Sequence, residues 1–398
     1  MHGEDFVTVT NGMVDDTRVT LIIRGGRLLM PEGQLVAGTL AIRDERIVAV
    51  GAGDAAGDGA VTLDATGLVV APGFIDAQIN GGFGHDFTET PGAMWRVGAR
   101  LPATGVTAFL PTIITAPPER IDAAQAAFLS GPPPDYRGAM PLGLHLEGPF
   151  LNPQSCGAHA GAYLQEPSRD AAPAWTPERG VRLVTLAPEL PGALALIAAL
   201  TRRGVVVGAG HSRASVAEMR RAFDAGLRYG THLFNAMGPL HHREPGIAGA
   251  LLAEPGAVVG LIADGVHVHP QMVSLAREVL GPRLNLVTDA MAALGMPPGA
   301  YRLGARAARV AEGQARLADG TLAGSVLTLD AAVRNLCAFT GCALAEAVRA
   351  VTRTPAALFG LDRGTLAPGR IADVVLLTDT GHVAATVARG RVVYRRGL

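Results

Sequence analysis

Three short segments, far apart in the chain, carry side chains suited to binding a metal ion. Glu147 lies in the sequence HLEGP, His211 in GHS and His232 in THL. Each segment comes at the end of an apolar run that resembles a β-strand. One carboxylate and two neutral imidazoles are a common ligand set for catalytic zinc, with a fourth position left for water. The sequence therefore predicts one divalent metal per subunit, with zinc expected before other divalent ions.

A second carboxylate and a third histidine end two other apolar runs. Asp289 ends the apolar run within the sequence LVTDA, and His267 follows an Asp-Gly turn. A carboxylate opposite the metal ligands is placed to take a proton from an activated water and to deliver it to a leaving amine. Its alternative roles are a helix cap or an ion pair with an arginine. His267 is either a group that polarises a substrate carbonyl or an ordinary surface histidine. Together with Glu147, His211 and His232, these two residues favour a metal-dependent hydrolase.

Two amides and one more histidine lie beside this set. Gln78 and Asn80 share one face of the first apolar run, and amides are poor metal ligands compared with histidine. We therefore expect one tight metal, with these amides at a weak second site or on the rim. His145 lies two residues before Glu147, so both side chains point to the same side of the expected strand. We interpret it as a partner of the ligands, with direct ligation as the alternative.

The middle of the chain alternates strand-like runs with helical stretches such as residues 193–203 and 216–225. This alternation predicts an α/β fold, a (β/α)₈ TIM-type barrel over residues 71–360, whose usual size is about 250 residues or more. Active sites of such barrels lie at the carboxyl ends of the strands, where the polar residues above fall. The eight expected strands are residues 73–79, 106–111, 142–147, 181–188, 205–210, 229–233, 258–263 and 284–289.

Both ends of the chain have a different texture, with short strand-like runs separated by turn signals such as Gly25-Gly26. We expect residues 18–70 and 361–398 to build one small β-sandwich domain together, and residues 1–17 to be an N-terminal extension. The runs are residues 19–23, 27–30, 39–42, 46–50, 61–63, 371–377 and 383–394.

Two long segments interrupt the barrel pattern on the side of the polar residues. Residues 152–175 are rich in Pro, Gly, Ala and Ser, and residues 291–324 contain signals for a hairpin. Long loops on an active-site rim are often lids, and a plain surface excursion is the alternative for each.

Composition excludes several classes of function. The chain has 398 residues, of which 48% are hydrophobic and 17% charged, with a formal net charge of −1. This balance, without a block of like charge, gives no sign of a nucleic-acid partner. No signal peptide or apolar run of about 18 residues is present, so we expect a cytoplasmic protein with no membrane partner. The three cysteines form no CxxC motif, and we expect no function for them.

Lysine is absent, so all 34 basic residues are arginines. A Walker-type phosphate loop and a Schiff-base mechanism both need a lysine, and so does a carboxylated lysine that bridges two metals. These chemistries are excluded.

The motifs resemble those of the N-acetylglucosamine-6-phosphate deacetylases, a family within the amidohydrolase superfamily. The resemblance runs in order from about residue 20 to the end of the chain, and Gln78-Ile79-Asn80 stands where many superfamily members have His-x-His. The matching segments are PGFID (72–76), HLEGP (145–149), GAH (157–159), LAPE (186–189), AGHS (209–212), THLFNAM (231–237), REPG (243–246), IADG (262–265), VTDA (287–290), LAGS (322–325) and TLAPGRIAD (365–373).

The resemblance implies hydrolysis of the acetamide of N-acetylglucosamine 6-phosphate to glucosamine 6-phosphate and acetate. It implies that Glu147, His211 and His232 bind the metal, that Asp289 is the general base and acid, and that His267 contacts the scissile carbonyl. It also implies a homodimer and a single zinc or similar ion. The residues implied to bind the sugar phosphate are His159, Asn235, the Ala236 backbone and Arg243, the last from the partner subunit.

Three other functions remain open at this point. One is a deacetylase for the galactosamine isomer, because epimer preference is not readable from these residues. Another is a different amidohydrolase, such as a cyclic amidase, although the first-strand His-x-His and the bridging lysine of that class are missing. The third is a barrel that has lost catalysis, which would predict a missing ligand or acid/base residue, and none is missing.

Overall fold

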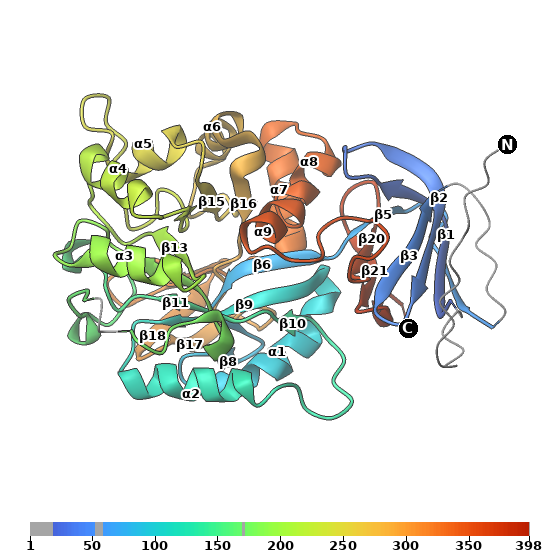
Figure 1. Cartoon of the computed structure of the whole chain (residues 1–398), viewed down its shortest axis with the longest axis horizontal. Helices are drawn as coiled ribbons and strands as arrows, with labels where there is room; N and C mark the ends of the chain where they lie inside the picture. The colour runs from blue at the N-terminus through green and yellow to red at the C-terminus, as the bar shows by residue number, and fades with distance from the viewer. Residues whose placement is uncertain (1–18, 52–58, 169–171, 398) are drawn as a thin grey trace, which may run out of the picture.

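The computed structural model describes residues 19–51, 59–168 and 172–397. The extension expected for residues 1–17 lies outside the described residues. A barrel with surrounding helices makes up most of the molecule, and a small sheet built from both ends of the chain lies at one side of it (Figure 1). This architecture confirms the predicted fold class, whereas the domain limits at residues 70/71 and 360/361 stay a prediction.

The barrel consists of parallel strands paired in the order of the sequence, with β6 joining β9 at the start. Its first and last members meet through a parallel bridge between Ile79 and Ala290. The Asn80 amide donates to the Ala290 carbonyl at 2.7 Å, and the Asp289 amide donates to the Gln78 carbonyl at 2.8 Å. The strands are β6 (Phe74–Ile79), β9 (Val106–Ile114), β11 (Leu144–Glu147), β12 (Val181–Leu186), β13 (Val206–Ala209), β14 (Tyr229–Gly230), β15 (Val258–Leu261) and β16 (Leu284–Leu286), with short strands β7 (Gly81–Gly82), β8 (His85–Asp86) and β10 (Met140–Pro141) beside them.

Five barrel strands, the fourth to the eighth, end one to three residues earlier than predicted, and the two largest differences concern the site. The sixth, expected over residues 229–233, ends at Gly230, and the eighth, expected over residues 284–289, ends at Leu286. His232 and Asp289 therefore lie beyond the strands, where they adopt left-handed φ values of 33° and 49°. Apolar residues continue past both strand ends because the turns are buried, which made the runs read as longer strands.

The helices cover the outside of the barrel and confirm the helical stretches predicted near residues 193 and 216. Helix α4 begins with a capping box, in which the Ser215 hydroxyl accepts from the Glu218 amide and the Glu218 carboxylate accepts from the Ser215 amide. No helix in the described part of the chain is long and apolar enough to cross a membrane. The helices are α1 (Met94–Arg100), α2 (Pro118–Leu129), α3 (Ala193–Arg202), α4 (Val216–Asp224), α5 (Gly246–Ala253), α6 (Pro270–Leu280), α7 (Leu329–Thr340), α8 (Leu344–Arg349) and α9 (Arg353–Leu358).

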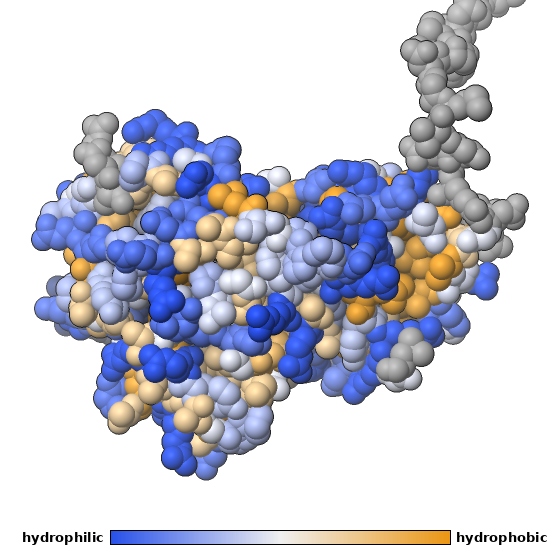
Figure 2. All heavy atoms as spheres, turned by 90° about the horizontal axis from the view of Figure 1, so that it is seen from below, coloured by the Kyte–Doolittle hydropathy of each residue, from blue (hydrophilic) through white to orange (hydrophobic). Residues whose placement is uncertain are grey.

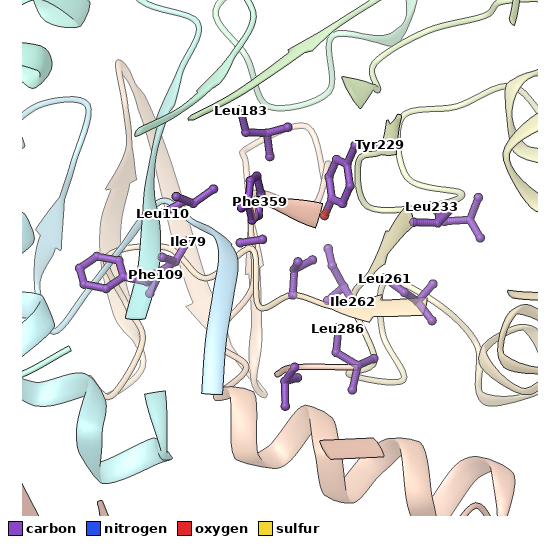
Figure 3. Close-up of a cluster of buried hydrophobic side chains, with 14 of the residues drawn as sticks. Ile79, Phe109, Leu110, Leu183, Tyr229, Leu233, Leu261, Ile262, Leu286 and Phe359 are labelled. Atoms are coloured by element: carbon purple, nitrogen blue, oxygen red, sulfur yellow. The ribbon is translucent and has the colours of Figure 1, made fainter. Parts of the chain in front are cut away.

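The barrel interior is a packed core. Figure 3 shows apolar side chains from different strands gathered there, including Leu110, Leu183 and Leu286. These three side chains are fully buried. Truncating a buried leucine of this kind to alanine usually costs about 2–5 kcal/mol. The core thus fixes the strand ends that carry the polar residues.

The small sheet has eight strands in the order β22-β21-β20-β5-β1-β2-β3, with β4 paired to β1. It curls back on itself, because the Ile47 amide donates to the Arg370 carbonyl at 3.0 Å, and it encloses a separate apolar core. Figure 2 shows hydrophobic surface gathered at this end of the molecule, whereas most of the remaining face is hydrophilic. The strands are β1 (Leu21–Leu29), β2 (Leu35–Arg43), β3 (Arg46–Gly51), β4 (Val61–Asp64), β5 (Val69–Pro72), β20 (Val374–Leu377), β21 (Val383–Ala388) and β22 (Arg391–Arg395).

The turn predicted at Gly25-Gly26 is wrong. Strand β1 passes through both glycines, and its register with β2 shifts between Ile23 and Gly26. Gly25 adopts a φ of 80°, as a glycine does in a β-bulge. Two adjacent glycines signal a turn and a bulge equally, because a positive φ occurs both in several turn types and in the G1 bulge.

The second rim segment forms the predicted hairpin with a third strand added. Strands β17 (Gly299–Leu303), β18 (Arg306–Ala311) and β19 (Gln314–Arg316) form an antiparallel sheet. The first rim segment contains two short 3₁₀ turns, Pro153–Ser155 and Gly161–Tyr163. Both segments lie beside the carboxyl ends of the barrel strands and form walls of the cavity described below.

Candidate active site

Glu147, His211 and His232 converge at the mouth of the barrel. One ligand atom of each lies within 4.8 Å of the others, and all three residues are buried. Glu147 Oε1 lies 3.2 Å from His211 Nε2 and 2.9 Å from His232 Nε2, and the two Nε2 atoms are 3.0 Å apart. Tetrahedral ligands about 2.0–2.1 Å from a zinc ion would be separated by roughly 3.3 Å. The three atoms therefore need to move only a few tenths of an ångström to hold one metal ion.

The surroundings of each ligand prepare it to bind a cation. The Ser155 carbonyl accepts a hydrogen bond from His211 Nδ1 at 2.9 Å. The other ring nitrogen, Nε2, therefore directs its lone pair at the site. Burial acts to raise the pKa of Glu147, but hydrogen bonds with His211 and His232 hold it well below its usual value. Burial acts to lower the pKa of His232, yet its hydrogen bond with Glu147 raises it overall. Glu147 is therefore an anion that lies between the two imidazoles.

Backbone strain coincides with the site. His211, His232 and Asp289 are all non-glycine residues with left-handed φ values, of 49°, 33° and 49°. Such conformations cost of order 1–3 kcal/mol each and persist where the surrounding structure holds them. Each turn brings its side chain from the end of a strand toward the barrel axis.

Asp289 lies across from the ligands and is held by the two amides of the first strand. Asn80 Nδ2 donates to Asp289 Oδ1 at 2.7 Å, and Gln78 Nε2 lies 3.2 Å from the same oxygen and 3.1 Å from Glu147 Oε1. Burial, together with the charge of Glu147, raises the pKa of Asp289. The amide oxygens of Gln78 and Asn80 are buried without a hydrogen-bond partner among the described residues. The amides thus orient both carboxylates and leave acceptor atoms free.

His267 is oriented by Asp264, whose role the sequence reasoning missed. Its Nδ1 lies 2.7 Å from Asp264 Oδ2, and its backbone amide donates to Asp264 Oδ1 at 2.8 Å. His267 lines the cavity, so Nε2 is the ring nitrogen left for a ligand. The signal was present as an aspartate three residues before the histidine in a turn, a spacing at which its carboxylate caps the backbone.

His159 and His145 lie against the ligands without joining them. His159 Nδ1 accepts from the Thr115 amide at 3.2 Å, while its Nε2 lies 3.7 Å from Glu147 Oε2. His145 Nε2 is 2.8 Å from the Thr185 hydroxyl. Burial lowers the pKa of His159 to about 3 and that of His145 to about 4. Both rings are therefore neutral near pH 7, and His145 lies beside the cluster of Glu147, His211 and His232.

A cavity of about 510 Å³ opens over these residues. Asn235 and Ala236 line it, whereas Arg243 does not. Arg243 is exposed, and its guanidinium contacts His242 Nε2 at 2.9 Å. Two other arginines, Arg213 and Arg316, line the cavity and were missed, because neither lies in a matching motif. The cavity is lined by Asn80, Ile114, Glu147, Gln154, Ser155, Gly157, Ala158, His159, His211, Arg213, His232, Asn235, Ala236, Met237, His267, Asp289, Leu303, Arg316, Thr321, Leu322 and Gly324.

Comparison with known proteins agrees with this geometry. The sequence model of the amidohydrolase family matches residues 69–393. This chain belongs to the amidohydrolase family. Human N-acetylglucosamine-6-phosphate deacetylase is 42% identical to this amidohydrolase, and the match covers 95% of this chain and 92% of the human protein. The N-acetylgalactosamine-6-phosphate deacetylase of Escherichia coli O157:H7 is 39% identical, with coverage of 94% and 99%.

A solved structure extends the likeness to the fold. A mutant N-acetyl-D-glucosamine-6-phosphate deacetylase from Mycobacterium smegmatis, in complex with N-acetyl-D-glucosamine 6-phosphate, superposes on this amidohydrolase with a TM-score of 0.86. It is 37% identical, and the match covers 94% of this chain and 99% of that one. This amidohydrolase is therefore a hydrolase of the same family, and its buried Glu/His/His cluster suggests a divalent metal.

Proposed function

We propose that this amidohydrolase removes the acetyl group of N-acetyl-D-glucosamine 6-phosphate, giving D-glucosamine 6-phosphate and acetate. One observation carries the proposal: Glu147, His211, His232 and Asp289 converge in one cavity of a chain that matches deacetylases over nearly its whole length. The cavity, at about 510 Å³, lies within the usual range of about 300–1,000 Å³ for small-molecule sites.

The metal is proposed to be one zinc ion per chain, held by Glu147, His211 and His232. Two imidazoles and one carboxylate suit zinc, and the amides Gln78 and Asn80 in place of stronger ligands leave at most a weak second site. When bound, the ion would supply Lewis acidity that lowers the pKa of the attacking water to about 7.

The chain's own residues carry the proton transfers. Asp289 takes a proton from the water as it attacks the acetamide carbonyl carbon, and returns that proton to the amine nitrogen as the C–N bond breaks. The raised pKa of Asp289 suits a carboxyl that must both hold and release a proton. His267, held by Asp264 through Nδ1, presents Nε2 to the carbonyl oxygen, where negative charge develops.

Binding of the sugar phosphate is assigned to His159, Asn235 and the Ala236 backbone, with Arg243 supplied by a partner subunit. The exposed position of Arg243, outside the cavity of its own chain, supports a role across a homodimer interface. Phosphorylated sugars do not cross membranes unaided, which supports the cytoplasm as the place of action.

The test is acetate release from N-acetylglucosamine 6-phosphate, from the unphosphorylated sugar and from N-acetylgalactosamine 6-phosphate, before and after chelation and zinc addition. We expect metal-dependent turnover of the glucosamine phosphate, falling by about 10²–10⁴-fold in Asp289→Asn. No turnover of any of the three by a metal-loaded protein would refute the substrate assignment. Faster turnover of the galactosamine isomer would favour the second candidate, which the match to the Escherichia coli enzyme supports.

A mixing experiment tests the dimer. Asp289→Asn and Arg243→Gln are each expected to be weakly active, but a mixed dimer holds one site with an intact Asp289 and an Arg243 from its partner. Refolding the two variants together should recover activity that neither has alone. The absence of recovery in a confirmed mixed dimer would place Arg243 outside the partner's site.

A further inference from the structure

The cavity of a single chain already contains two cationic side chains. Arg213 follows the fifth barrel strand, and Arg316 lies in β19 of the rim insertion. The carboxylates of the cavity, Glu147 and Asp289, are buried and engaged with the histidines and amides of the metal site. The ion pairs found among the described residues include neither Arg213 nor Arg316. The cavity therefore has an acidic, metal-binding floor and a basic mouth.

Arg213 is positioned by a hydrogen bond of its backbone amide, and its guanidinium takes part in no ion pair among the described residues. The Glu189 carboxylate accepts from the Arg213 amide at 2.7 Å, from the Ser212 hydroxyl at 2.6 Å and from Asn152 Nδ2 at 2.8 Å. The Arg213 side chain makes only a long contact, from Nε to the Ser155 hydroxyl at 3.4 Å. No described residue accepts a hydrogen bond from its two terminal amino groups. Glu189 thus fixes the start of the side chain and leaves the guanidinium free for a ligand.

Arg316 is oriented by neutral groups only. Its Nη1 donates to the Gly320 carbonyl at 2.6 Å, and its Nε and Nη2 donate to Gln314 Oε1 at 3.0 and 2.8 Å. These bonds stiffen the guanidinium within the hairpin without neutralising it. A pre-oriented, uncompensated guanidinium loses less conformational entropy when it binds an anion.

The strand pairing places Arg213 beside the segment to which sugar-phosphate binding is assigned. The Ser212 amide donates to the Ala236 carbonyl at 3.3 Å, and Ser212 forms a parallel bridge with Met237. Ser155, which Arg213 contacts, lines the same cavity as Ala236. A phosphate on the Asn235–Ala236 turn would therefore lie next to the Arg213 guanidinium.

We propose that Arg213 binds the substrate phosphate within its own chain, and that Arg316 adds a second, weaker attraction from the rim insertion. The proposal rests on the proposed function for the sugar, and it identifies the phosphate-binding residues of the same site. Guanidinium groups bind phosphate oxygens through paired, charge-assisted hydrogen bonds, which are stronger than neutral ones. Specificity for a phosphorylated sugar is then partly a property of each chain and does not depend only on Arg243 of the partner subunit.

The experiment compares Arg213→Gln and Arg316→Gln with two controls that remove the same charge elsewhere. Arg220→Gln changes an exposed arginine of α4, and Arg309→Gln changes one in β18 of the same insertion, neither of which lines this cavity. Calorimetric binding of glucose 6-phosphate, with glucose as reference, gives a readout that is independent of catalysis. Acetate release gives kcat and KM.

We expect Arg213→Gln to weaken glucose 6-phosphate binding and to raise KM by about tenfold or more, as the loss of a charge-assisted bond implies. Arg316→Gln should have a smaller effect, kcat should change little, and both controls should match the wild type. Unchanged binding by Arg213→Gln, in a protein that turns over the substrate, would overturn this inference alone. Arginine-dependent phosphate binding without turnover would support the inference and refute the proposed activity. A wild type that binds no sugar phosphate would overturn both.

Discussion

Glu147 is the residue on which the interactions of the site converge. Its Oε1 contacts His211, His232 and Gln78, and its Oε2 faces His159. This concentration of polar groups around one buried carboxylate is costly unless a cation or protons balance the charge. A divalent metal would provide that balance, so its removal should lower the stability of the whole fold.

Replacing Glu147 by glutamine should therefore remove most of the stabilisation that the protein gains from binding metal. In the wild type, saturating zinc should raise the melting temperature, because a ligand at about 100 times its Kd stabilises the folded state by about 2.7 kcal/mol. In Glu147→Gln we expect less bound metal and little or no such rise. The measurements are metal content and thermal unfolding with and without chelator. Glu166→Gln, an exposed change on the rim loop, is the control, and an equal rise in all three proteins would contradict the assignment.

The Asp264–His267 pair is the second feature at this scale. Asp264→Asn keeps an oxygen to cap the turn but loses the anion that faces His267 Nδ1. We expect kcat to fall about tenfold or more, less than the roughly 10²–10³-fold cost of deleting an oxyanion-binding group. KM and the melting temperature should change less than kcat. Asp64→Asn, which alters a similar turn in the small sheet, should keep wild-type kcat.

At the scale of elements, the turns after the barrel strands matter more than the strands themselves. Strand β14 has only two residues, yet the turn that follows it supplies His232, Asn235 and Ala236. His232, Phe234 and Ala236 in this turn all have positive φ values. Alternating handedness folds the backbone tightly enough for five consecutive residues, His232 to Ala236, to supply both a proposed metal ligand and a wall of the cavity.

The bulge in β1 gives a test of element geometry away from the site. An added Cβ at Gly25 would lie 2.6 Å from the Thr66 hydroxyl, at a φ of 80°. We expect Gly25→Ala to destabilise the small sheet by more than the roughly 1–2 kcal/mol that the left-handed conformation alone costs. Gly33→Ala is the matched control, since its φ is 93° and nothing lies within 4 Å. Equal losses of unfolding free energy in denaturant titrations would show that the contact with Thr66 is unimportant.

At the scale of the whole molecule, the barrel is completed where its two ends meet. Asp76 in the first strand is fully buried, and its carboxylate accepts from the Thr288 hydroxyl at 2.6 Å and the Thr288 amide at 3.2 Å. This contact joins segments that are far apart in sequence and lies next to Asp289. The residue that closes the barrel and the carboxylate proposed for proton transfer are therefore neighbours in the backbone.

Thr288→Val should weaken this closure. The substitution keeps the side-chain shape but removes a hydrogen bond to a buried carboxylate, at a cost of about 1–3 kcal/mol. We expect a lower melting temperature and a fall in kcat, because Asp289 follows directly. Thr288→Ser retains the hydroxyl and should stay near the wild type in both measurements. A valine variant as stable as the serine variant would show that other pairings are enough to close the barrel.

The sequence by itself determined the barrel, the small sheet at the chain ends, and the grouping of Glu147, His211 and His232. Barrel strands run parallel, so polar residues that follow successive apolar runs must meet at one rim. The hairpin in residues 291–324 was predictable for a similar local reason, since its turn signals lie within a few residues of each other.

Only the tertiary structure decided which other residues reach the cavity. Arg213 and Arg316 carry no local sequence signal. The position of Arg213 depends on the hydrogen bond from its amide to Glu189, and that of Arg316 depends on how the rim insertion folds over the barrel. The orienting role of Asp264 and the end of β14 before His232 also depended on three-dimensional packing. Periodicity reports which face of an element is buried, but the direction of a side chain beyond a strand end is set by a turn that the rest of the fold holds in a strained conformation.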